Sequence, residues 1–336
     1  MGMRYLITGG AGFIGSHLAE HLIEGGASVT AIDDLSTGSL ANVSVLARHP
    51  RFRMVVSPVE DEPVLHELVA EADVVVHLAA AVGVRLIVES PVRTIFTNVH
   101  GTEAVLRAAE ISKTRVIVAS TSEVYGKSEA CPFREDSDLL LGPPTKGRWS
   151  YACSKALDEF LALAYGRERG VPVTIVRPFN IVGPRQTGRY GMVIPSFVRQ
   201  AITGEPITVF GDGKQSRCFT HVRDAVVALG RLATEPRAIG ETFNLGNPQE
   251  ISINDLAILV REVVGSRVPI VHVPYDEAYE AGFEDMRRRV PDVTKLTNLV
   301  GFRPVRDVRR CIEDVVDSMA PKAREMDEPF VAAKVA

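Results

Sequence analysis

The stretch LITGGAGFIGSHLAEHL (residues 6–22) decides the fold, because it joins a strand-like apolar run, a glycine-rich turn and an amphipathic helix in direct succession. The turn satisfies G-x-G-x-x-G through Gly10, Gly12 and Gly15, and Gly9 extends the pattern. Glycines allow a tight turn and a close approach to the backbone, while the helix N-terminus offers unpaired N–H groups to a pyrophosphate. The stretch therefore predicts a dinucleotide site at the first strand–helix turn.

An acidic residue ends the second predicted strand. Asp33 lies 18 residues after Gly15, where this type of fold places the acid that binds the adenosine ribose hydroxyls. Asp34 follows, and no arginine comes next to accept a 2′-phosphate. The pattern favours NAD over NADP.

Strand-like and helix-like segments alternate through the first half of the chain. Six runs predict buried strands: 4–9, 28–33, 51–57, 73–80, 115–120 and 173–180. Helix-length segments lie between most of them, at 15–26, 63–72, 98–112 and 150–170. Strands that alternate with helices run parallel and are joined by right-handed crossovers. We predict an α/β fold with a Rossmann-type doubly wound parallel sheet.

The pattern changes after about residue 180, where loop-like sequence dominates. Further helices are expected near 194–203, 252–265 and 307–320, with Ser252 or Asn254 as the N-cap of the second. We predict a Rossmann domain over residues 1–180, to which 218–247 returns. The remaining segments 181–217 and 248–320 form a smaller α/β region, and 321–336 form a flexible tail.

Composition narrows the class of protein. The 336 residues are 46% hydrophobic and 24% charged, with a net charge of −4, which gives no sign of nucleic-acid binding. No apolar run approaches the roughly 18–20 residues of a membrane span, and no signal peptide is expected. The four cysteines are scattered without a C-x-x-C pair, so we expect free thiols in a reducing cytoplasm, with neither a metal site nor disulfides.

Five motifs in a fixed order resemble one family. They are GGAGFIG (9–15), HLAA (77–80), STSEVYG (120–126), YACSK (151–155) and RPFNIVGPRQ (177–186). Together they resemble the extended short-chain dehydrogenase/reductases, and among these the nucleotide-sugar epimerases, dehydratases and decarboxylases. The resemblance extends to about residue 316. It implies bound NAD, a UDP-sugar substrate held by the smaller region, and a homodimer formed through the segments at about 98–111 and 151–167.

The resemblance assigns roles around the YACSK motif. Tyr151 would accept the proton of the sugar 4-hydroxyl, Lys155 would hold the nicotinamide ribose, and Thr121 would bond the same hydroxyl. The C4 hydride would pass to NAD⁺ and leave a 4-keto sugar. A free phenol has a pKa of about 10, so we expect Lys155 and the nicotinamide charge to lower the pKa of Tyr151 by several units.

The same resemblance implies further cofactor contacts, from Phe13, Ile14, Leu78, Ala79, Ala80 and Asn98. One departure comes after the third strand, where many relatives have an acid near the adenine and then an apolar residue. Here Pro58 stands in place of the acid and Val59 follows, which leaves a backbone contact and puts the side-chain contact in doubt.

Substrate contacts are also implied by resemblance. Those for the diphosphate and uridine are Asn180, Arg217, Arg289 and Asp292, with Val193 in VIPSF and Val209 in TVFG near the uracil. Arginines suit phosphate because the guanidinium offers two parallel donors. Arg85, Arg185 and Arg189 are candidates for binding a substrate carboxylate.

The overall reaction depends on the fate of the 4-keto intermediate. Ser122 and Glu123 stand where the 4,6-dehydratases carry an Asp-Glu pair, which argues against loss of water. Glu123 in TSE resembles UDP-glucuronate decarboxylases, whereas GVR (83–85) and GPRQ (183–186) resemble UDP-sugar 4-epimerases. We predict a 4-epimerase of a UDP-hexose or UDP-hexuronate, with UDP-glucuronate decarboxylase as the alternative. A 4,6-dehydratase, a plain alcohol dehydrogenase and a non-catalytic NAD-binding regulator are further alternatives.

Overall fold

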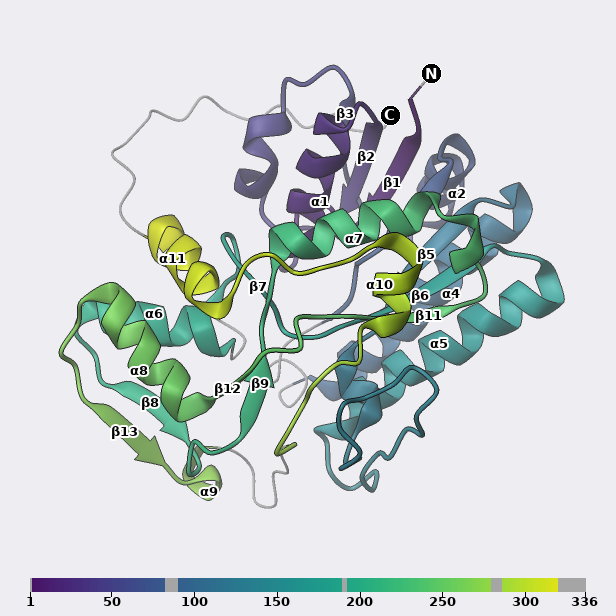
Figure 1. Ribbon diagram of the computed structural model, residues 1–336. Coiled ribbons are helices and arrows are strands. Elements are labelled where there is room, and N and C mark those ends of the chain that lie inside the picture. The colour runs from purple at the N-terminus through teal and green to yellow at the C-terminus, as the bar shows by residue number, and fades with distance from the viewer. Residues whose placement is uncertain (1, 82–89, 189–191, 279–285, 320–336) are drawn as a thin grey trace.

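The computed structural model describes residues 2–81, 90–188, 192–278 and 286–319 (Figure 1). Its centre is a seven-stranded sheet in the order β11-β6-β5-β4-β1-β2-β3, and all six neighbouring pairs are parallel. The strands are β1 (Arg4–Thr8), β2 (Ser28–Asp33), β3 (Phe52–Val56), β4 (Val74–His77), β5 (Arg115–Ala119), β6 (Val173–Pro178) and β11 (Thr242–Leu245). The predicted doubly wound parallel sheet is therefore confirmed.

Helices cover both faces of this sheet. On one face lie α2 (Glu62–Glu71), α4 (Pro91–Ser112) and α5 (Trp149–Arg169), and on the other α1 (Phe13–Glu24) and α7 (Val222–Thr234). Strand β4 is buried at all four positions, as expected for a parallel strand covered on both sides. Helix α4 begins at Pro91, earlier than the expected residue 98, because proline is favourable in the first turn of a helix.

A second, smaller core lies beside the sheet (Figure 1, lower left). It packs helices α6 (Val193–Thr203), α8 (Ile253–Val264) and α11 (Val308–Met319) with the parallel pair β8 (Ile207–Phe210) and β13 (Ile270–Val273). The expected N-cap of α8 is Ser252, whose Oγ accepts from Asp255 N at 3.0 Å. Asn254 instead donates to Asp212 O.

Short elements complete the described fold. They are β7 (Ile181–Val182) paired with β10 (Thr220–His221), β9 (Ser216–Cys218) paired with β12 (Glu250–Ser252), the helices α9 (Tyr275–Ala278) and α10 (Thr294–Val300), and the 3₁₀ segments η1 (Leu40–Leu46), η2 (Ser122–Tyr125) and η4 (Pro236–Ala238). Between the two segments of the smaller core, the chain supplies α7 and β11 to the large sheet. The expected tail over 321–336 lies outside the described residues. Within the described part of the chain, no helix is both long and apolar enough to cross a membrane.

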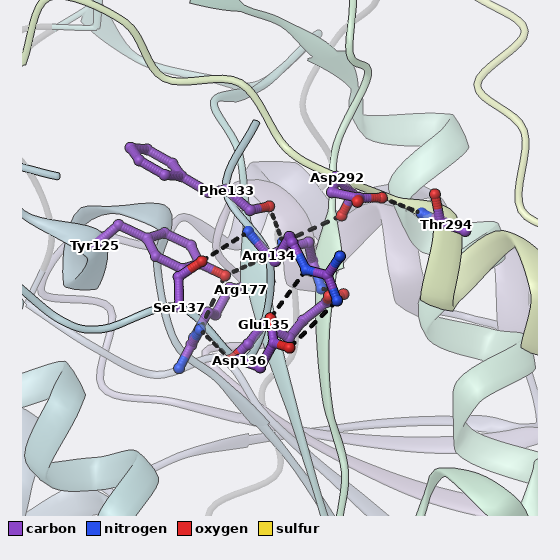
Figure 2. A network of polar contacts seen from close by, with 10 residues as sticks. Tyr125, Phe133, Arg134, Glu135, Asp136, Ser137, Arg177, Asp292 and Thr294 are labelled. Atoms are coloured by element: carbon purple, nitrogen blue, oxygen red, sulfur yellow. Dashed lines mark hydrogen bonds and ion pairs between the residues drawn. The ribbon is translucent and has the colours of Figure 1, made fainter. Parts of the chain in front are cut away.

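A buried polar network ties α5 to the sheet. The guanidinium of Arg177 on β6 donates to both carboxylate oxygens of Glu159 on α5, at 2.8 and 2.6 Å, and both side chains are only 7% exposed. Figure 2 shows Arg177 also reaching the Tyr125 hydroxyl and the backbone oxygen of Glu135, at 2.9 and 3.2 Å. The Glu135 carboxylate in turn accepts from Asn244 N of β11 at 2.8 Å.

We predict that Arg177→Met destabilises the fold strongly, because it leaves the buried Glu159 carboxylate without its cation. The expected loss of unfolding free energy is about 3–5 kcal/mol. The matched control is Arg134→Met, which breaks the exposed Arg134–Asp136 pair of the same network. Urea unfolding of both variants should show a large loss for the first and little change for the second. Equal losses would contradict the assignment.

Candidate active site

The glycine turn between β1 and α1 has no room for side chains. A Cβ on Gly15 would lie 2.3 Å from Gly9 O, and a Cβ on Gly10 would lie 2.4 Å from the Cβ of Ala31. Gly9 has φ +70°, and a Cβ there would also lie 2.9 Å from Ala79 N. The turn therefore brings bare backbone to the start of α1 and to the end of β4, which suits a nucleotide diphosphate. These residues fit bound NAD.

Asp33 joins this turn to the end of β2. Its carboxylate accepts from Ala11 N at 3.0 Å and from Leu35 N at 2.8 Å. Burial raises the pKa of Asp33, and these backbone donors oppose that rise. Asp34 accepts from Ser36 N at 2.9 Å. Both acids thus lie beside the turn, as the NAD interpretation requires.

One cavity of about 500 Å³ runs from this turn to the ends of β5 and β6. Most of the residues predicted for the site line it: Gly9, Gly12, Phe13, Ile14, Gly15, Asp33, Asp34, Val59, Leu78, Ala79, Ala80, Thr121, Ser122, Glu123, Tyr151, Asn180, Arg185 and Arg289. Lys155, Asn98, Arg217, Val193, Val209 and Asp292 are not among its lining residues. Arg85 and Arg189 lie outside the described residues.

Tyr151 lies near the start of α5, with Thr121 and Glu123 close to its phenol. Burial raises the pKa of Tyr151 above its ordinary value, the Glu123 carboxylate raises it further, and a hydrogen bond with Thr121 lowers it. This direction is opposite to the lowering expected from Lys155 and the nicotinamide charge, and in the protein alone the lysine ammonium is directed toward another residue. Its Nζ lies 2.6 Å from Asp158 Oδ2.

Asn98 supports the site from behind the cavity wall. Its Oδ1 accepts from Ala81 N at 2.8 Å, and its Nδ2 donates to Ser154 Oγ at 3.1 Å. It therefore joins the segment after β4 to the helix of Tyr151. These contacts give Asn98 a positioning role within the protein, and its expected contact with the cofactor stays a prediction.

Glu123 lies between two buried arginines. Arg148 Nη1 is 3.3 Å from one carboxylate oxygen, and Arg289 Nη1 is 3.6 Å from the other. Arg289 was expected near the diphosphate, and Arg148 was not predicted at all. Arg148 directly precedes α5. It is far from Glu123 in the sequence, so no local pattern predicts their ion pair.

The segment that follows Arg289 is hydrogen-bonded to the loop of Phe133. Phe133 N donates to Val290 O at 2.8 Å, and Asp292 N donates to Phe133 O at 2.8 Å. Two backbone hydrogen bonds therefore join the segment after Arg289 to the loop that also contacts Arg177. Asp292 Oδ1 accepts from Thr294 N at 2.8 Å, and the expected contact of Asp292 with the uridine ribose stays a prediction.

The remaining substrate candidates have different environments. Asn180 has φ +38°, lines the cavity and donates to Cys218 O at 2.7 Å. Arg185 also lines the cavity, but its guanidinium bonds Ser16 Oγ at 3.1 Å and forms an ion pair with Glu20, both on α1. Arg217 donates to Ser216 O within β9. Val193 begins α6, and Val209 is buried in β8.

Comparison with known proteins shows that this chain is similar to a family of enzymes. A model of the NAD dependent epimerase/dehydratase family matches residues 5–246, which include the glycine turn, Thr121 and Tyr151. The chain is 47% identical over 305 residues to UDP-N-acetyl-alpha-D-glucosaminuronate decarboxylase of Bacillus cytotoxicus, covering 90% of this chain and 94% of that protein. It is 37% identical over 302 residues to UDP-glucuronic acid decarboxylase 1 of Xenopus tropicalis, covering 90% and 68%.

A solved structure with a different reaction is also similar. UDP-glucose 4-epimerase of Thermotoga maritima, determined with UDP-glucose, has a TM-score of 0.83 at 29% identity, covering 94% of this chain and 98% of that chain. The shared fold therefore does not discriminate between an epimerase and a decarboxylase, and the reaction is decided by the residues of the site.

We predict that Gly15→Ala weakens NAD⁺ binding, because the new Cβ would collide with the backbone oxygen of Gly9 and displace the turn. Calorimetric titration with NAD⁺ should show a loss of about ten-fold or more, or about 1.4 kcal/mol. Gly147→Ala is the matched control, since a Cβ there meets nothing within 4 Å. Unchanged affinity in Gly15→Ala would contradict the role given to the turn.

Proposed function

The chain belongs to the NAD dependent epimerase/dehydratase family, and on this premise we propose that it decarboxylates a UDP-linked hexuronic acid. NAD is its cofactor, as the glycine turn and Asp33 predicted. We prefer this alternative to the expected 4-epimerase, because the relatives from Bacillus cytotoxicus and Xenopus tropicalis are both decarboxylases. We favour the 2-acetamido sugar over glucuronate, since the more similar of the two is named for it.

The observation that carries the proposal is the pair of Glu123 and Arg289 in the cavity beside Tyr151. A guanidinium can bind a carboxylate through two parallel hydrogen bonds, so Arg289 is suited to hold the carboxylate at C5 of a uronic acid. A neutral hexose offers no anion at this position of the sugar ring. Arg185 is not assigned this role, because its guanidinium contacts Ser16 and Glu20 on α1 and not Glu123 beside Tyr151.

The residues then suggest the order of steps. Bound NAD⁺ serves as the reversible acceptor of the hydrogen on C4. Tyr151 takes the proton of the 4-hydroxyl, while the Thr121 hydroxyl orients that oxygen. The product is a β-keto acid, so the bond between C5 and the carboxylate breaks and its electron pair delocalises into the 4-ketone. CO₂ leaves as this bond breaks, and the resulting enolate takes one proton at C5. A hydride would then return to C4, and Tyr151 would return its proton to the 4-oxygen.

The phenol needs help to act as a base. Burial and Glu123 both raise the pKa of Tyr151, so the protein alone favours the neutral phenol at neutral pH. The cationic nicotinamide ring of NAD⁺ is a charge of the sign that opposes this shift. We infer that Tyr151 becomes an effective base only in the cofactor-bound enzyme.

A product assay tests the proposed reaction. Purified protein with catalytic NAD⁺ is incubated separately with UDP-N-acetylglucosaminuronate, UDP-glucuronate and UDP-glucose, and the products are read by proton NMR and mass spectrometry. We expect one uronate to lose CO₂ and give the UDP-pentose, with UDP-glucose unchanged. Tyr151→Phe should lose this activity while binding NAD⁺ normally. A product of unchanged mass with inverted C4 would restore the epimerase assignment.

We also propose that the protein is a homodimer formed through α4 and α5, which lie side by side (Figure 1). Both helices expose large apolar side chains that soluble monomers usually cover. On α5 these are Leu157 and Phe160, and on α4 they are Val92 and Phe96. Phe160 is 66% exposed and Phe96 is 57% exposed in the single chain. A second copy of the same face would bury them around a two-fold axis.

We predict that Phe160→Asp converts the dimer to a monomer, because it places a charge in the middle of this apolar face. Size-exclusion chromatography with light scattering measures the mass directly. Val305→Asp is the control, since Val305 is 78% exposed but lies after α10, away from the two helices. A wild-type mass of one chain would overturn the proposed dimer, as would a dimeric Phe160→Asp variant.

A further inference from the structure

We propose that Asp158 is a positioning residue that keeps the ammonium of Lys155 charged and fixed on the inner side of α5, one helical turn from Tyr151. Lys155 Nζ lies 2.6 Å from Asp158 Oδ2, and their side chains are 2% and 0% exposed. Lys155 is the lysine of the family's Tyr-Lys pair, so this role of Asp158 holds whichever sugar reaction the enzyme performs.

The energetics of burial support this role. An unpaired ammonium in a dry interior is so costly that the amine would lose its proton or the side chain would leave. Asp158 supplies the compensating charge within one turn of the same helix, so Lys155 can remain cationic while almost fully buried. A neutral amine would not attract negative charge in the adjoining cavity. The electrostatic role of Lys155 therefore depends on Asp158.

The other ionisable groups near Lys155 have hydrogen-bond or ion-pair partners of their own. His77 on β4 is buried between the hydroxyls of Thr8 and Thr102, at 2.7 and 3.2 Å from its two ring nitrogens. Burial and the Lys155 charge lower the pKa of His77 to about 3, so this imidazole is neutral. Glu159, the next residue on α5 after Asp158, is held by Arg177.

Two further groups complete the surroundings. Glu123 on η2 is held by Arg148 and Arg289, and Tyr151 on α5 contributes a phenol that is neutral in the protein alone. Among the residues that the structure describes, Asp158 is therefore the carboxylate that forms an ion pair with Lys155. Its removal would leave the ammonium without this compensating anion.

The geometry of Asp158 also argues against a purely structural purpose. Its Oδ1 is buried. Burial raises the pKa of Asp158 more strongly than the Lys155 ammonium lowers it, and a hydrogen bond from the Thr102 hydroxyl also lowers the pKa of this carboxyl. Buried ion pairs often contribute less to stability than apolar residues of similar size. A carboxylate kept here at this cost of burial is better explained by the charge state of Lys155 than by stability.

The test is Asp158→Asn, which keeps the size of the side chain and an acceptor for the lysine but removes the charge. NAD⁺ binding is measured by calorimetry between about pH 6 and pH 9, together with the pH profile of turnover. We expect binding to weaken with rising pH in the variant, by up to about ten-fold for each pH unit above the new lysine ionisation, while the wild type stays nearly flat. Turnover should fall over the same range. A variant with lower thermal stability but wild-type pH dependence would overturn the proposal.

A double variant separates action through Lys155 from any independent effect. In a Lys155→Met background, Asp158→Asn should change neither the NAD⁺ affinity nor its pH dependence, because the group it supports is gone. A further loss of affinity in the double variant would contradict the proposal. If Asp158→Asn alone does not fold, Lys155→Met/Asp158→Asn should fold, since no unpaired ammonium remains. Failure of both to fold would also overturn it. None of these readouts depends on decarboxylation.

Discussion

Every buried charge in this molecule must have a partner, and α5 carries an unusual number of them into the interior. Its inner side presents a phenol, an ammonium and two carboxylates, from Tyr151, Lys155, Asp158 and Glu159. Each requires a partner at hydrogen-bonding distance, so the helix cannot slide or rotate without leaving a charge unpaired. Arg177 fixes the helix to the sheet, and the same arginine reaches the loop that positions the segment of Arg289. The pairing of buried charges therefore also fixes the positions of residues that line the candidate active site.

Much of the fold can be predicted from local patterns. Glycine spacing predicts the first turn because each position lacks space for a Cβ, and apolar runs predict strands because parallel strands are covered on both faces. The cavity also brings together Thr121, Glu123 and Tyr151 as the motifs predict. These features depend on residues near one another in the sequence or on a few motifs in a fixed order.

Other features depend on contacts between residues that are far apart in the sequence, which no local pattern predicts. Arg148 meets Glu123 across a loop, Arg185 reaches Glu20 from the opposite half of the chain, and Asn98 contacts Ser154 and not the cavity. The proposed reaction differs from the expected 4-epimerase because the similar proteins are decarboxylases. A Ser-Glu pair is compatible with more than one outcome, and the significance of Glu123 emerges only once the arginines around it are known.

The ion pair between Arg185 and Glu20 has a consequence for cofactor exchange. It links the segment after β7 to the helix that follows the glycine turn, and Arg185 holds a left-handed backbone conformation, φ +69°, that its surroundings must maintain. Part of the wall beside the nucleotide region is therefore clamped electrostatically to α1. A reaction that returns its hydrogen within each cycle has no need to release the oxidant. We expect this clamp to slow release of the nucleotide, which the proposed reaction tolerates, and we expect salt that screens the ion pair to speed that release.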